Sequence, residues 1–143
     1  MSQQIIYDYA VSYLGTPYRW GGDDPINGID CSGLVIEILQ AAGIFPRGYD
    51  SPAKAIFKDL QRQGAVFASK AQFGTILFFG KTPDTISHTG FALSEKLFIE
   101  AGGGDSSVIN NQVAAVKNAF VRIRPITWRS DLSAMVDPKY FWR

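Results

Sequence analysis

The spacing of apolar residues changes once along this chain, at Gly64, and that change limits the folds the chain can adopt. Before Gly64, apolar side chains recur every three to four residues, which predicts amphipathic helices. After Gly64 the period falls to two, and β-branched and aromatic residues become common, which predicts strands. Helices followed by strands are typical of an α+β fold built on an antiparallel sheet.

Capping residues and breakers set the expected bounds of these elements. A long irregular stretch, residues 15–29, is rich in Gly and Pro and is expected to be an ordered loop. The predicted helices are Ser2 to Leu14, Cys31 to Ala42 with Asp30 as N-cap, and Pro52 to Gly64 with Ser51 as N-cap, the last with a thin apolar face suited to the surface. The predicted strands are Ala65–Ala68, Thr75–Phe79, Thr89–Leu93, Leu97–Ala101 and Ala119–Ile126.

Length and charge exclude several classes of protein. A chain of 143 residues fits one domain, residues 1–143. Lys and Arg total 14 and Asp and Glu 13, so the net charge of +1 argues against a nucleic-acid partner. One Cys and one His allow no internal disulfide and no zinc site made of Cys and His clusters, so we expect no metal and no cofactor. No apolar run is long enough for a membrane span or a signal peptide.

The single cysteine, Cys31, is expected in the first turn of the best-defined helix, directly after the N-cap. Unpaired backbone N–H groups and the positive end of the helix dipole favour a thiolate there. A lone cysteine in a soluble protein is also often buried and inert. Position alone leaves the nucleophile and the structural interpretation equally open.

The single histidine, His88, opens a predicted hairpin. If the chain reverses at Ser94 to Glu95, residue 88 faces Glu100 across the ladder. Alternation then places Phe91, Leu93, Leu97 and Ile99 on a core face and His88, Gly90, Ala92, Phe98 and Glu100 on the other. The small Gly90 and Ala92 leave room on that second face for the helix start that carries Cys31.

This geometry predicts a catalytic trio of Cys31 as nucleophile, His88 as general base and acid, and Glu100 as the group that orients the imidazole. A thiol attacks as thiolate, an imidazole transfers its proton near neutral pH, and a third group fixes the tautomer. Taken singly, His88 is better interpreted as a satisfied structural residue and Glu100 as a solvated carboxylate at a strand edge.

Two sequence runs carry a family resemblance. Gly15-Thr-Pro-Tyr-Arg-Trp-Gly-Gly22 is followed by Asp30-Cys-Ser-Gly-Leu-Val35, and His88-Thr-Gly90 opens a strand downstream. In this order they closely resemble the NlpC family of papain-like cysteine peptidases, whose members cut bacterial cell-wall peptides. The resemblance covers roughly Ile5 to Ala101. It implies a papain-like α+β fold in which the Cys helix packs on an antiparallel sheet.

The resemblance also implies roles for individual residues. Cys31 matches the nucleophile and His88 the base, while Tyr18 falls where family members place a tyrosine near the oxyanion site. Losing one oxyanion donor typically costs about 3–4 kcal/mol of transition-state stabilisation. Asp30 and Ser32 match positions that hold the free amine of the substrate. For Tyr18, loop packing remains an alternative, and Asp30 also serves as an N-cap.

The third catalytic position departs from the family, where it is usually His, Asn or Gln and here is Glu100. A carboxylate orients the imidazole and also favours its protonated form. Two unit charges about 4 Å apart interact by roughly 4 kcal/mol at an effective dielectric near 20. We therefore expect Glu100 to extend the Cys31 thiolate–His88 imidazolium pair to higher pH. The alternative is that Glu100 binds an amino group of the substrate.

Other polar features receive simpler interpretations. The acidic stretch from Asp23 to Asp30 lacks the ligand spacing of a calcium loop, and turn chemistry explains it. Trp20 either lines the substrate groove or packs in its loop. Three arginines near the end are expected to be solvated charges on a strand face: Arg122, Arg124 and Arg129.

The sequence thus predicts a cysteine endopeptidase acting on peptidoglycan stem peptides, for which the family points to the bond after D-glutamate. We expect no separate wall-binding module. Two alternatives stay open: an amidase or acyltransferase that uses the same Cys–His site, or a non-catalytic wall-binding or tail-structural protein. Without a visible leader, we expect synthesis in the cytoplasm, action at the cell wall, no membrane partner, and a phage or prophage origin. The oligomeric state is not indicated.

Overall fold

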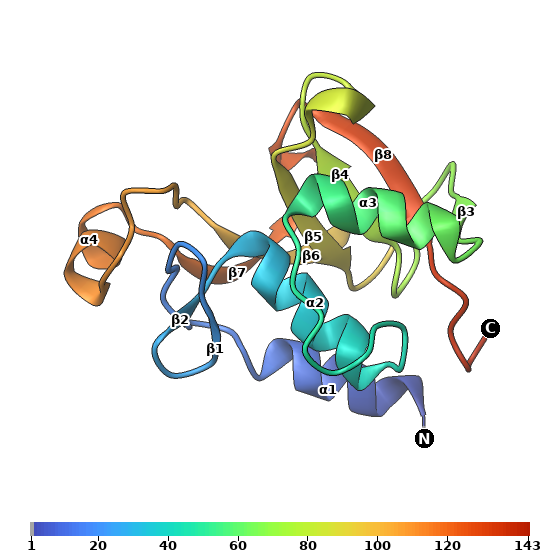
Figure 1. Cartoon of the computed structure of the whole chain (residues 1–143), viewed down its shortest axis with the longest axis horizontal. Coiled ribbons are helices and arrows are strands. Elements are labelled where there is room, and N and C mark those ends of the chain that lie inside the picture. The colour runs from blue at the N-terminus through green and yellow to red at the C-terminus, as the bar shows by residue number, and fades with distance from the viewer. Residues whose placement is uncertain (1) are drawn as a thin grey trace.

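Three helices form in the first half of the chain, where the apolar spacing predicts them. The computed structural model describes residues 2–143, and Figure 1 shows helices α1 (Gln3–Val11), α2 (Cys31–Ala41) and α3 (Ala53–Arg62). Five of the six helix bounds differ from the prediction, by one to three residues. The first helix stops at Val11 rather than Leu14, and Pro52, not Ser51, is the N-cap of α3. Pro52 takes an extended backbone conformation, which starts the helix one residue late.

The second half forms a six-stranded sheet whose neighbouring strands are all antiparallel, in the order β3-β8-β4-β5-β6-β7. Its strands are β3 (Val66–Phe67), β4 (Ile76–Phe79), β5 (His88–Ala92), β6 (Leu97–Gly102), β7 (Phe120–Pro125) and β8 (Leu132–Asp137). The predicted mixture of helices and antiparallel sheet is therefore confirmed. The five predicted strands are all present, with no end shifted by more than one residue.

Several elements were not predicted from the sequence. The most important is β8, which lies inside the sheet between β3 and β4 although its sequence, LSAMVD, has no run of β-branched residues. The others are a small hairpin in the early loop, β1 (Asp23–Asp24) with β2 (Gly28–Ile29), a short helix α4 (Asn111–Val116), and two 3₁₀ turns, η1 (Pro83–Thr85) and η2 (Ile126–Trp128).

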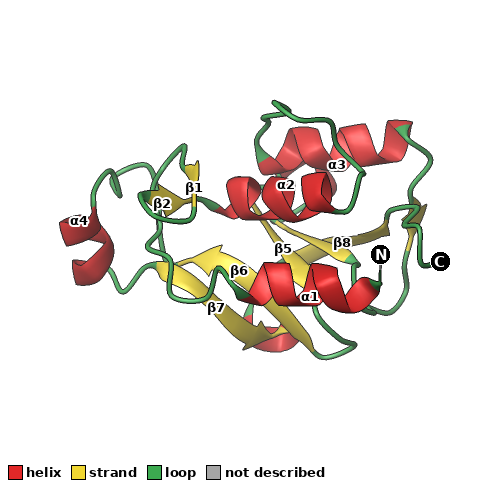
Figure 2. Cartoon of the chain, turned by 90° about the horizontal axis from the view of Figure 1, so that it is seen from below, coloured by secondary structure: helices red, strands yellow, loops and turns green. Residues whose placement is uncertain are grey.

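The helices cover one face of the sheet, as Figure 2 shows for α1, α2 and α3. On that face, Leu34, Ile38 and Leu39 of α2 share a buried cluster with Phe91 of β5 and Ile99 of β6. The opposite face carries a second, smaller buried cluster, formed by Ala71, Leu77, Phe79, Ala92 and Phe98. The alternation of side chains along each strand separates the two clusters.

The register of the β5–β6 hairpin differs from the prediction by two residues. Phe91 pairs with Ile99 and Ala92 with Phe98, so the chain reverses around Glu95. The cause is the turn itself, in which the Ser94 hydroxyl accepts hydrogen bonds from the backbone N–H groups of Lys96 and Leu97. A shift of two residues keeps every side chain on its predicted face.

The predicted place of the Cys helix on the sheet is wrong. The space beside Gly90 is filled by the Phe98 side chain, which would lie 2.5 Å from a Cβ at that position. The apolar side of α2 instead packs against the face that carries Phe91 and Ile99. Because His88 is the first residue of β5, the start of α2 meets it at the end of the strand rather than over the sheet face.

Candidate active site

A cleft of about 660 Å³ lies where the start of α2 meets the start of β5. Cys31 and His88 both line it. We call one side the nucleophile wall, which consists of Tyr18, Trp20, Asp30, Cys31 and Ser32. The other side is the histidine wall, which consists of His88 and Arg129 at the cleft surface, with Glu100 and Arg124 behind them.

The nucleophile wall is organised by the Asp30 carboxylate. Its Oδ1 accepts hydrogen bonds from the backbone N–H of Gly33 at 2.7 Å and from the Ser32 hydroxyl at 3.1 Å. Its Oδ2 accepts one from the backbone N–H of Gly21 at 3.0 Å. Burial raises the pKa of Asp30, and these hydrogen bonds oppose that shift. Asp30 thus caps α2 and fixes Cys31, which is partly exposed, as its first residue.

The early loop packs tightly against the first turn of α2. A Cβ at Gly33 would lie 2.4 Å from the carbonyl oxygen of Gly22, so only glycine allows this approach. The loop is held from the other side by backbone hydrogen bonds, from Tyr18 to the carbonyl of Ala119 at 3.0 Å and from Trp20 to that of Val108 at 2.7 Å. The loop is therefore a fixed part of the cleft.

Two aromatic side chains of this loop line the cleft. Tyr18 is buried, and the backbone of Gly104 passes so close to its ring that a Cβ there would lie 2.1 Å from a ring carbon. Burial, followed by the charges of Cys31, Asp30 and Asp105, raises the pKa of Tyr18. Its hydroxyl therefore stays protonated and able to donate. Trp20 is 56% exposed, as a residue at the rim would be.

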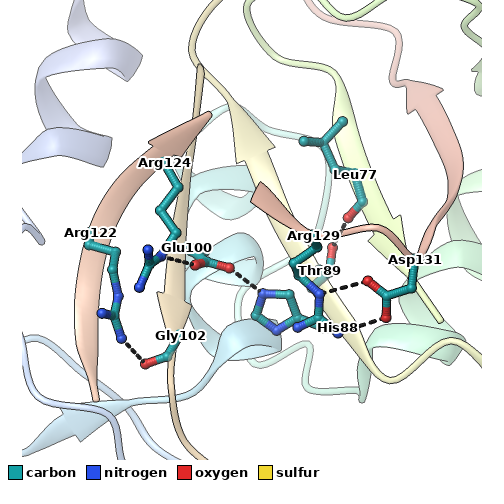
Figure 3. Close-up of polar contacts among 9 residues, drawn as sticks. All are labelled: Leu77, His88, Thr89, Glu100, Gly102, Arg122, Arg124, Arg129 and Asp131. Atoms are coloured by element: carbon teal, nitrogen blue, oxygen red, sulfur yellow. Dashed lines mark hydrogen bonds and ion pairs between the residues drawn. The ribbon is translucent and has the colours of Figure 1, made fainter. Parts of the chain in front are cut away.

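On the histidine wall, the His88 ring lies between a carboxylate and the thiol. His88 Nε2 and Glu100 Oε1 are 2.6 Å apart, and both residues are buried (Figure 3). Burial alone would lower the pKa of His88, but hydrogen bonds to Cys31 and Glu100, with their charges, raise it to about 9. Because Nε2 is engaged with Glu100, Nδ1 is the nitrogen left for Cys31. The imidazolium form is thus favoured across neutral pH.

Glu100 is held by a second cation on its other oxygen. Arg124 Nε lies 3.1 Å from Glu100 Oε2, and the Arg124 guanidinium stacks 3.9 Å from the centre of the Trp128 ring. Burial would raise the pKa of Glu100, but His88, Arg124 and Arg122 together lower it. Glu100 is therefore an ionised carboxylate with one oxygen toward His88 and the other toward Arg124.

The prediction that the three C-terminal arginines are solvated is wrong. Arg124 has the contacts just described, and Arg122 donates to the backbone carbonyls of Gly102 and Asn118. Arg129 lies at the cleft and forms a bidentate pair with Asp131, at 2.8 Å for both Nε and Nη2 (Figure 3). The contacts of Arg124 with Glu100 and of Arg122 with Gly102 depend on β6 and β7 being neighbours, whereas Arg129 and Asp131 are two residues apart in the sequence.

The structure brings six of the seven predicted site residues to the cleft surface and places Glu100 directly behind His88. The sequence missed Arg129 and also Asp50, Ser87 and Asp105, which line the same cleft. None of these four belongs to a motif with its own spacing. The catalytic and binding roles of the seven residues stay predictions.

Among residues 2–143, no three His, Cys, Asp or Glu residues are arranged to hold a metal ion. In the early loop, Asp24 accepts hydrogen bonds from the backbone of Ile26 and Asn27, and these lower its pKa. In the same described part of the chain, every helix is too short or too polar to span a membrane.

Comparison with known proteins gives consistent matches. The model of the NlpC/P60 family matches residues 15–125. The bifunctional muramidase/DL-endopeptidase CwlT of Bacillus subtilis is 38% identical over 90 residues, covering 61% of this chain and 25% of that protein. Dipeptidyl-peptidase 6 of Lysinibacillus sphaericus is 31% identical over 116 residues, covering 78% of this chain and 36% of that protein.

A solved structure agrees over nearly the whole chain. The NlpC/p60 domain of the peptidoglycan hydrolase SagA superposes with a TM-score of 0.63 and 26% identity, covering 96% of this chain and 99% of that one. The papain-like α+β fold is thereby confirmed. The chain matches only about a quarter to a third of the length of the two relatives above.

Proposed function

This chain belongs to the NlpC/P60 family, and we propose that it is a cysteine endopeptidase that hydrolyses peptide bonds in the stem peptides of bacterial peptidoglycan. The observation that carries the proposal is the buried pairing of His88 with Glu100 at the edge of the cleft that Cys31 also lines. The names of CwlT, a DL-endopeptidase, and SagA, a peptidoglycan hydrolase, support the substrate class.

The chemistry follows from the protonation states. In the proposed reaction the Cys31 sulfur gives its proton to His88 and attacks the peptide carbonyl carbon, forming a tetrahedral intermediate. His88 then gives its proton to the leaving amine as the C–N bond breaks, which leaves a thioester on Cys31. Water attacks the thioester, His88 takes a proton from that water, and Cys31 is released with the acid product.

The oxyanion of both intermediates needs donors near Cys31. The Cys31 backbone N–H lies at the start of α2, where helix N–H groups have no partner within the helix. The Tyr18 hydroxyl is the second donor we assign, since it lines the cleft beside Cys31 and its raised pKa keeps it protonated. Two such donors stabilise the charge that develops in the transition state.

We assign substrate positioning to the rest of the nucleophile wall. Asp30 and Ser32 face the cleft and form an acceptor pair for the free amine of the stem peptide, and Trp20 at the rim contacts the peptide chain. Glu100 is assigned to orienting His88 rather than to binding substrate. That assignment is supported by the burial of Glu100, 3% exposed, and by the two cations that engage its oxygens.

The decisive experiment is mass spectrometry of purified muropeptides after incubation with the protein and with Cys31→Ala. We expect cleavage by the first and a loss of about 10,000-fold or more in the second, because the covalent step is gone. Ser12→Ala, on the turn after α1, is the matched control and should cleave normally. The mass of the products identifies the bond, which the name of CwlT suggests lies between a D and an L residue.

Failure to cleave is also informative. If neither protein cleaves but Cys31 is alkylated rapidly at neutral pH, the site is an acyl-transfer site for another substrate. If the thiol is also slow, a non-catalytic binding protein becomes the function to pursue. The single-domain extent, the cytoplasmic synthesis and the phage or prophage origin stay predictions, since neither the fold nor the relatives test them.

A further inference from the structure

The cleft is lined by charges of both signs. Three carboxylates, Asp30, Asp50 and Asp105, line it together with the nucleophile wall. Among the described residues that line the cleft, Arg129 is the single permanent cation, and it lies on the other side with His88. A substrate that bears an amine at one end and a carboxylate at the other matches this arrangement.

Arg129 is held in place rather than free to move. The Asp131 carboxylate accepts hydrogen bonds from Nε and Nη2 of Arg129, at 2.8 Å each. The guanidinium lies 5.2 Å from the centre of the Phe79 ring. Asp131 is itself anchored, because its backbone carbonyl accepts a 2.9 Å hydrogen bond from the N–H of Gly80. The Nη1 side of the Arg129 guanidinium remains for a ligand. A planar guanidinium binds a carboxylate well through its N–H groups.

The location of Arg129 indicates which part of a substrate it meets. The Phe79 ring that supports Arg129 also contacts the His88 ring, with ring centres 5.5 Å apart. His88 gives its proton to the leaving amine in the proposed reaction, so groups beside His88 face the leaving part of the peptide. Arg129 also lies beyond residues 15–125, the part of the chain that the family model matches.

We propose that Arg129 binds a carboxylate on the leaving part of the substrate, so that the protein selects peptides in which the residue after the cleaved bond carries a free carboxylate. Asp131 is a positioning residue that presents the guanidinium. The inference rests on the proposed peptidase function and specifies the substrate class of the same cleft.

The first test compares two synthetic stem peptides that differ only in this group, a free carboxylate in one and a carboxamide in the other. For the unmodified protein we expect kcat/KM to be about 10- to 100-fold higher for the carboxylate peptide, the ratio typical of a hydrogen bond to a charged group. In Arg129→Gln the preference should fall to near one, because the carboxylate peptide should lose more of its kcat/KM than the carboxamide peptide.

Two further variants test whether the preference for the carboxylate peptide depends on Arg129 and on its pairing with Asp131. Arg62→Gln removes the same charge from an exposed position on α3 and should keep the preference. Asp131→Asn should weaken the preference while retaining part of it, because Arg129 keeps its charge and loses its clamp. Equal cleavage of the two peptides by the unmodified protein, or an equal loss on both peptides in Arg129→Gln, would overturn the proposal.

The second test does not depend on peptidase activity. Iodoacetate and iodoacetamide alkylate the same thiol, but iodoacetate carries a carboxylate where iodoacetamide has a neutral amide. The rate of Cys31 alkylation by iodoacetate divided by the rate by iodoacetamide therefore reports whether the cleft attracts a carboxylate. Arg129→Gln should lower the ratio roughly two- to fivefold, the effect of one partly screened charge. Arg62→Gln should leave it unchanged.

The two tests separate the two claims. If no peptide is cleaved but the ratio falls in Arg129→Gln, the peptidase proposal fails and the carboxylate site stands. If the ratio is the same in Arg129→Gln and in the unmodified protein, the carboxylate site is refuted whatever the peptides show. Iodoacetamide, which is neutral, also checks that each variant retains a folded and reactive site.

Discussion

The two walls of the cleft are built from different kinds of sequence. Every residue of the nucleophile wall lies between positions 18 and 32, and the hydrogen bonds of the Asp30 side chain reach residues of the same stretch or the next residue, Gly33. The residues of the histidine wall come from β5, β6, β7 and the segment before β8. They meet only because those strands are neighbours or border the same cleft.

This difference has consequences for function. In the nucleophile wall, a local hydrogen-bond network fixes geometry, so a substitution should change either the stability of the helix start or one transition-state contact. In the histidine wall, buried charges act on one another across strands, so a substitution should change protonation states. Three substitutions test whether the two walls separate in this way.

The largest effect is expected from Tyr18→Phe in the nucleophile wall. Removing one oxyanion donor should lower kcat and kcat/KM equally, by about 100- to 1,000-fold, because the contact is made in the transition state. Steady-state kinetics across pH would measure this, with Tyr7→Phe on α1 as the matched control. A rise in KM at constant kcat would instead place Tyr18 in substrate binding, and a shifted pH profile would break the distinction between the walls.

Glu100→Gln in the histidine wall should act mainly through pH. The pKa of His88 is raised to about 9, so the imidazolium persists to that pH, and removing the carboxylate should lower the alkaline limb of the pH–rate profile by about 1–2 units. Glu95→Gln, at the exposed hairpin turn, is the control. An alkaline limb that does not move would rule out the orienting role.

The same pair predicts a pH-dependent stability. A histidine whose folded pKa is above its unfolded value of 6.5 stabilises the fold below that pH and loses the contribution as pH rises through about 9. The stability advantage of the unmodified protein over Glu100→Gln, measured by urea unfolding, should therefore shrink between about pH 6.5 and 9. A constant difference would show that the pair is not titrating there.

The smallest effect is expected from Asp30→Ala, which removes the N-cap of α2. Loss of a side-chain cap typically costs about 0.5–2 kcal/mol of folding free energy. Asp30→Asn, which can still accept from the Gly33 N–H, should lose less. Thermal unfolding measures both. The alkaline limb should stay in place in each, and a displaced limb would show that charge in the nucleophile wall also sets the protonation of His88.

The sequence predicted the nucleophile wall better than the histidine wall, and the reason is the range of the interactions. Asp30 as N-cap and Cys31 as first helical residue follow from adjacent residues, and the structure has both. The pairing of His88 with Glu100 was inferred through a hairpin register that proved to be off by two residues. The inference survived because a shift of two preserves the face of each side chain.

The errors that concern the site are mostly errors of long-range placement. The sequence predicts the helix on the wrong face of the sheet because Gly90 and Ala92 suggest open space, whereas Phe98 fills the space beside Gly90. The sequence predicts a solvated Arg124 because its partner Glu100 depends on strand order, and a solvated Arg129 because its place at the cleft depends on the path of the chain before β8. β8 itself has a weak pattern and forms because β3 and β4 both pair with it.

The sequence by itself determined the helices, most strands, the cap at Asp30 and the candidate nucleophile, because each depends on neighbours a few residues away. Only the tertiary structure decided that Arg124 stabilises Glu100 and that Arg129 faces the cleft. The physical reason is that the energy of a buried charge depends on what surrounds it in space. For His88 and Glu100, those surroundings are supplied by strands that lie far apart in the sequence.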